Sequence, residues 1–181
     1  MNYFKRVSLF IAVGATVLLT GLRANAFTAD KAVTTQAGVD YSKSTPQVYD
    51  DTSIKMFVDY INLITPFDGG NGLVVSSVTL NEKDININSI CSPLIGMGLA
   101  YVTNDAIENS KREIALLLYQ SMEQIELDDN GNSFLGVLID KNIVFNYNYY
   151  VQGSSTPACT IKITAEYIEH VGDIQKNGYS I

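Results

Sequence analysis

The chain has 181 residues, with 12 basic and 19 acidic side chains and a formal net charge of −7 at neutral pH. This acidic balance disfavours nucleic acid and anionic lipid surfaces as partners, because binding to both depends on clustered Lys and Arg. With one histidine and two cysteines, the sequence also offers few ligands for zinc.

The first 26 residues have the order of parts typical of a secretory signal peptide. Lys5 and Arg6 form a positive start, residues 7–19 are almost continuously apolar, and Ala-Asn-Ala at 24–26 is a small-x-small cleavage motif. The apolar run is shorter than the roughly 20 residues that cross a bilayer, which favours cleavage over a retained anchor. We therefore expect no stable membrane insertion after cleavage and a periplasmic or secreted location, with bacterial export favoured over eukaryotic secretion.

The remaining chain predicts one domain. Residues 27–50 are polar and lack periodicity, so we expect a loosely ordered N-terminal arm. A single α+β domain is predicted over residues 51–170 and a C-terminal tail over residues 171–181.

Two amphipathic helices are predicted. The first has helical spacing at Ile54, Phe57, Val58, Ile61 and Ile64. It is expected to begin at Asp51 or Thr52 as N-cap and to end before Pro66. The second covers residues 104–127, with Asn104 or Asp105 as cap and a capping-box spacing between Asp105 and Glu108.

Four strands are predicted, in two pairs. The runs 73–80 and 84–91 form one hairpin, the two halves of 142–168 form the other, and "FDGGNG" before them is interpreted as a turn. The element order α-β-β-α-β-β predicts a two-layer α+β domain, in which two helices cover an antiparallel sheet of about four strands. The apolar segment 92–103 is interpreted as a buried crossover, a short extra strand or a mobile lip.

The alternation of side chains along the last two strands predicts which residues are buried. Tyr147, Tyr149 and Cys159 fall on the apolar face, whereas Tyr150 falls on the opposite face. Cys91 has inward parity on its own strand. In an oxidising compartment this predicts a Cys91–Cys159 disulfide, with two free buried thiols as the alternative.

Motifs for catalysis are weak. "ELDDNGN" resembles the start of a calcium loop, but Val137 stands where the bidentate Glu would be needed, so a plain helix-stop turn is favoured. A Ser-His-Asp triad would depend on His170, without a Gly-x-Ser-x-Gly elbow. We therefore expect no catalytic residue, no metal site and no cofactor, although converging carboxylates would leave no signature in the sequence.

These observations favour an exported, non-enzymatic domain that binds another exported or envelope protein, one with a basic surface. It would be an accessory factor of an envelope or secretion system, or an inhibitor or immunity-type protein. The alternative is a periplasmic carrier of a small apolar ligand or lipid. The residues suited to contact a partner are Tyr150, Leu94, Ile95, Met97, Leu99 and Tyr101.

Overall fold

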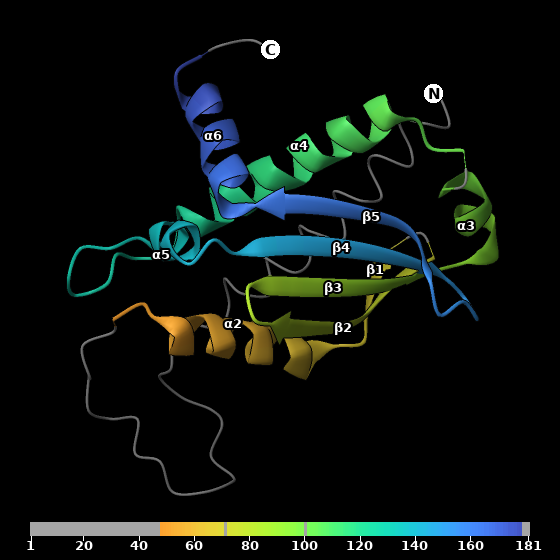
Figure 1. Ribbon diagram of the computed structural model, residues 1–181, viewed down its shortest axis with the longest axis horizontal. Coiled ribbons are helices and arrows are strands. Elements are labelled where there is room, and N and C mark those ends of the chain that lie inside the picture. The colour runs from red at the N-terminus through yellow and green to blue at the C-terminus, as the bar shows by residue number, and fades with distance from the viewer. Residues whose placement is uncertain (1–47, 71, 100, 179–181) are drawn as a thin grey trace, which may run out of the picture.

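The computed structural model describes residues 48–70, 72–99 and 101–178 (Figure 1). The predicted signal peptide and residues 27–47 of the predicted arm lie outside this part of the chain. Within it, the protein is an α+β domain in which helices pack against a single sheet.

The sheet has five strands, in the same spatial order as in the chain. They are β1 (Phe67–Gly70), β2 (Leu73–Asn81), β3 (Asp84–Cys91), β4 (Val144–Val151) and β5 (Pro157–Thr164). The two predicted hairpins are confirmed as β2–β3 and β4–β5, both antiparallel. Two expectations were wrong: β1 adds a strand where a turn was predicted, and β3 pairs with β4 in parallel.

Five helices lie in the described residues, where two were predicted. They are α2 (Asp51–Ile64), α3 (Pro93–Leu99), α4 (Asn104–Met122), α5 (Phe134–Asp140) and α6 (Ala165–Lys176). A parallel pair needs a long crossover connection, and α3, α4 and α5 all lie in the connection between β3 and β4. The segment 92–103, interpreted as a loop, therefore contains a helix.

In both predicted helices the N-cap residue lies one position before the earliest cap that was predicted. Asp50 caps α2 by accepting a 3.0 Å hydrogen bond from the backbone N–H of Ser53, in a reciprocal capping box. Thr103 caps α4 by accepting from the N–H of Ala106 at 3.3 Å. Since Asp, Asn and Thr all serve as caps, composition alone left the starting residue open.

The end of the chain differs from the expected long strand and tail. β5 ends at Thr164, whose hydroxyl accepts a hydrogen bond from the N–H of Tyr167 and so caps α6. Ala165, Ile168 and Val171 are buried along one side of this helix, which continues to Lys176. The apolar side chains at alternate positions from 161 to 167 are compatible with one long strand and with a strand followed by a helix. Local periodicity therefore did not show where β5 ends.

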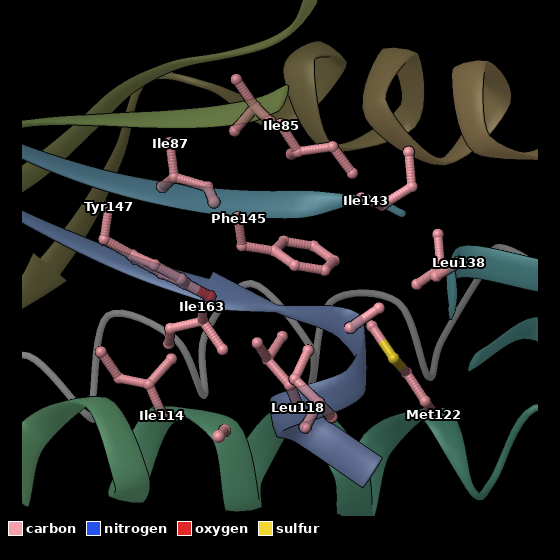
Figure 2. Close-up of a cluster of buried hydrophobic side chains, with 14 of the residues drawn as sticks. Ile85, Ile87, Ile114, Leu118, Met122, Leu138, Ile143, Phe145, Tyr147 and Ile163 are labelled. Atoms are coloured by element: carbon pink, nitrogen blue, oxygen red, sulfur yellow. The ribbon is translucent and has the colours of Figure 1, made fainter. Parts of the chain in front are cut away.

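One face of the sheet, the inner face, contacts the helices and forms the core. On β4, Phe145, Tyr147 and Tyr149 are each buried to within 3% exposure, which confirms the predicted parity. Figure 2 shows Phe145 and Tyr147 in one cluster with residues from α4 and α5. The cluster includes Ile85, Ile87, Ile114, Leu118, Met122, Leu138, Ile143, Phe145, Tyr147 and Ile163.

A bulge in β2 changes which of its residues face inward. The pairing with β3 shifts between Val75 and Ser77, so parity reverses along the strand. Val75 and Val78 are consequently both buried, whereas Val74 is 37% exposed. Strict alternation along this strand would place Val74 and Val78 on one face, and the bulge separates them.

The helix layer is closely packed where α4 crosses α6. A Cβ atom at Gly172 would overlap the ring of Tyr119, so only glycine allows this approach. Lys176 forms an ion pair with Glu123 and lies over the Tyr119 ring, 5.3 Å from its centroid. This contact joins α6 to α4. Both helices also contact β5, so they cover the inner face beside this edge strand (Figure 1).

Candidate functional site

The most exposed apolar group among the predicted contact residues lies on α3 and directly after its end. Leu94, Met97 and Tyr101 are 68%, 63% and 78% exposed. Leu94 and Met97 are one helical turn apart on α3, and Tyr101 follows two residues after the end of the helix, where its N–H donates to the carbonyl of Gly98. We call these three residues the α3 surface.

The opposite side of α3 is fixed to the domain. Leu99 is buried, and Ile95 packs against the core. A Cβ at Gly96 would overlap Val151 of β4, so the helix backbone lies directly against that strand. The α3 surface is therefore held in place by a packed helix. Of the predicted contact residues in this segment, Leu94, Met97 and Tyr101 are exposed, whereas Ile95 and Leu99 pack the helix against the domain.

The outer face of the sheet, opposite the core, carries a row of polar side chains across four strands. Thr160 donates to the Oδ1 atom of Asn148 at 2.9 Å, and the Nδ2 atom of Asn148 donates to Asn88 at 3.1 Å. Asn88 in turn donates to the hydroxyl of Ser77 at 3.0 Å. We call this row the amide ladder. All its hydrogen bonds run in one direction, from β5 to β2, an arrangement in which neighbouring bonds polarise one another.

A second row next to the ladder is incomplete. The Nδ2 atom of Asn146 donates to Asp84 at 3.0 Å and to Asn86 at 3.3 Å. Its Oδ1 atom is buried and has no hydrogen-bond partner. The β5 residue opposite Asn146 is Lys162, which is exposed, where the ladder has Thr160.

Tyr150 belongs to a third row on the outer face, and its predicted outward direction is confirmed. It is paired with Ile90, which is paired with Val74, and these two neighbours are 38% and 37% exposed. Tyr150 is itself half-buried. The row is apolar and lies at the end of β3 from which the chain enters α3.

The predicted disulfide is not formed, and both cysteines are free. The pairing register places Cys91 opposite Val151 and Cys159 opposite Tyr149, so β4 lies between the two cysteines. Two strand spacings separate their Cα atoms by about 10 Å, whereas a disulfide needs less than about 7 Å. Correct inward parity was therefore insufficient, because parity does not give the order of strands.

The thiols are poorly suited to nucleophilic chemistry. Burial, together with the nearby thiol of Cys159, raises the pKa of Cys91 to about 11. Burial also raises the pKa of Cys159. Because the thiolate is the reactive form, a raised pKa disfavours nucleophilic reactions at both side chains.

The aspartate-rich turn after α4 binds its own backbone. Asp128 accepts hydrogen bonds from the N–H groups of Tyr49, Asn130 and Asn132 and from the side chain of Asn132. Burial would raise the pKa of Asp128, but these bonds outweigh it and lower the pKa. Both carboxylate oxygens accept hydrogen bonds, and the bond from Tyr49 joins the residues just before α2 to this turn.

A metal-binding constellation is not found in the part of the chain that the structure describes. This part holds no group of three or more His, Cys, Asp or Glu side chains placed to bind a metal ion. His170 is exposed on α6, away from the inner face that holds the cysteines. Of the helices in residues 48–178, none combines the length and apolarity needed to cross a bilayer.

The amide ladder was missed by sequence reasoning. The available signal was the alternation of Asn86 and Asn88 in one strand and of Asn146 and Asn148 in another. It became a row only because β3 and β4 are parallel neighbours, which the sequence did not predict. No protein-family model, no curated protein and no solved structure matches the chain.

Proposed function

We propose that this protein is an exported, non-enzymatic domain that binds a basic protein of the cell envelope or of the secreted fraction. The proposal rests first on the α3 surface, three exposed apolar side chains on and directly after a helix whose other side is packed. Isolated exposed apolar residues are ordinary, but a grouped set with an aromatic and a methionine is typical of contact surfaces. The signal-like start of the sequence supports export.

The acidic balance supports a basic partner. Seventeen acidic and seven basic residues lie between positions 48 and 178, and the segment 92–103 that contains the α3 surface has no charge at all. An uncharged apolar contact inside a negative field attracts a positively charged protein and repels an acidic one. An accessory factor and an inhibitor or immunity-type protein would both use such a surface.

The alternative of an apolar-ligand carrier has less support. A ligand under the helices would have to replace side chains that already fill that layer, among them Phe145, Tyr147 and Ile163. Figure 2 shows these side chains directed at α4 from the sheet. Release of lipid from the purified, denatured protein would revive this alternative.

Site-specific photo-crosslinking tests the proposal in the organism that makes the protein. A crosslinker at Leu94 is expected to give a defined adduct with one exported protein, because this side chain is 68% exposed on the α3 surface. The matched control is Leu63 of α2, which is 82% exposed and outside that surface. Addition of Met97→Asp should remove the Leu94 adduct. Equal adducts at both positions, or an adduct unaffected by Met97→Asp, would contradict the proposal.

A further inference from the structure

We propose that the partner binds through a cationic amphipathic helix laid across the α3 surface, and not through a strand added to the sheet. This inference rests on the proposed function and specifies the contacting element of the partner. Two separate observations carry it: the shape and charge of the α3 surface, and the state of the two sheet edges.

The α3 surface has the geometry that receives a helix. Leu94 and Met97 lie about 5 Å apart along the axis of α3, and Tyr101 follows shortly after the end of this helix. A partner helix can meet such a row with apolar side chains at its own i, i+3, i+4 and i+7 positions. Met97 at the centre is unbranched and adapts to the side chains that it meets.

The net negative charge of the domain indicates which side chains the polar face of that partner helix carries. The domain between positions 48 and 178 has ten more acidic than basic residues. Three of its seven cations already lie in ion pairs with its own acids, namely Lys111 with Glu108, Lys141 with Asp51, and Lys176 with Glu123. Lys and Arg beside the apolar stripe of the partner would therefore approach a negative field. A second copy of this chain would meet repulsion instead.

Both edges of the sheet carry features that oppose strand addition. β1 is four residues long and its register shifts between Asp68 and Gly70. Beyond β1, the N–H of Val78 on β2 already donates to the side chain of Asn62 at 3.2 Å. On β5, Pro157 has no N–H and Lys162 is an exposed charge, two devices by which edge strands avoid pairing with other chains.

The test uses three synthetic peptides of about 18 residues and the isotope-labelled protein. One peptide places Leu and Lys with helical periodicity, the second has the same composition in strict alternation, and the third replaces Lys by Glu in the helical pattern. The helical cationic peptide is expected to bind and to shift the amide resonances of residues 93–102. Its affinity should fall roughly tenfold between about 50 and about 500 mM salt, because charges attract less strongly when screened.

Variants locate the contact. Met97→Asp should weaken binding of the helical cationic peptide at least tenfold, whereas Leu63→Asp, at an exposed position of α2, should leave it unchanged. The inference is overturned if the alternating peptide binds as well and shifts the resonances of β5, if the acidic peptide binds equally, if the two variants act alike, or if sedimentation shows that copies of the protein associate through α3. A crosslinked partner at Leu94 together with no binding of the helical peptide would keep the proposed function and refute the helical mode.

Discussion

The two faces of the sheet are built by the same strands but are stabilised by different physics. On β4, Tyr147 faces the helices and is 3% exposed, while its neighbour Asn148 faces outward and joins the amide ladder. The inner side chains gain stability by leaving water, a gain that scales with buried apolar area. The outer side chains exchange hydrogen bonds to water for hydrogen bonds to each other, which yields much less. Neighbouring residues of one strand should therefore differ several-fold in their effect on stability.

The largest effect is expected on the inner face. Tyr147→Ala removes a fully buried ring and should lower the free energy of unfolding by about 3–5 kcal/mol, because a cavity remains in the core. Urea denaturation followed by circular dichroism measures the change. Tyr150→Ala on the outer face is the matched control and should cost less than about 1 kcal/mol. Similar losses for the two tyrosines would remove the distinction between the faces.

A smaller loss is expected in the helix layer that covers the inner face. Gly172→Ala places a methyl group against the ring of Tyr119 and should destabilise the domain by about 1–3 kcal/mol. Gln175→Ala, at an exposed position of the same helix, provides the control for helix propensity. A stabilised Gly172→Ala variant would mean that α4 and α6 separate easily, since alanine otherwise favours helices.

The amide ladder should contribute less than either. Asn148→Ala removes the acceptor of Thr160 and the donor to Asn88, and we expect a loss of about 1 kcal/mol because these groups regain water. Thr79→Ala is the control, since Thr79 is exposed on the same face and outside the ladder. If both variants have the same stability, the ladder has no measurable energetic role.

The smallest effect tests the incomplete row. In the Lys162→Thr variant a threonine lies opposite Asn146, as Thr160 lies opposite Asn148 in the amide ladder. The new hydroxyl should donate to the unpartnered Oδ1 atom of Asn146. A gain of about 0.5 kcal/mol is expected in the same denaturation assay. Lys162→Val has nearly the same shape without a donor. The hydroxyl explanation fails if Val stabilises the domain as much as Thr.

Local pattern was sufficient for much of this architecture. The alternation in residues 143–151 correctly divided Tyr147 and Tyr149 from Tyr150, because successive side chains of a strand point to opposite faces whatever the neighbouring strand is. The spacing of Ile54, Phe57, Val58, Ile61 and Ile64 likewise predicted α2; its buried side is confirmed at Ile54, Val58 and Ile61, whereas Ile64 is 40% exposed. The exposed residues of the α3 surface were also among those predicted, although α3 itself was not.

The predictions that were wrong depended on contacts between residues that are distant in the sequence. The parallel pairing of β3 with β4 brings together strands about 60 residues apart, and it decided three outcomes. It separated Cys91 from Cys159 by one strand, aligned Asn88 with Asn148, and required a crossover that made residues 93–99 a helix packed on Val151. No local periodicity contains this information, because the hydrogen-bonding edge of a strand is the same for any partner.

The sequence by itself therefore determined the composition of each face and the acidic character of the chain, since these follow from side-chain chemistry and the two-residue period of a strand. Only the tertiary structure decided which strands are neighbours, and with that the free state of the thiols and the continuity of the amide ladder. It also decided the exposure of Leu94, Met97 and Tyr101, because side chains of an apolar segment are exposed or buried according to which side of the segment packs against the domain.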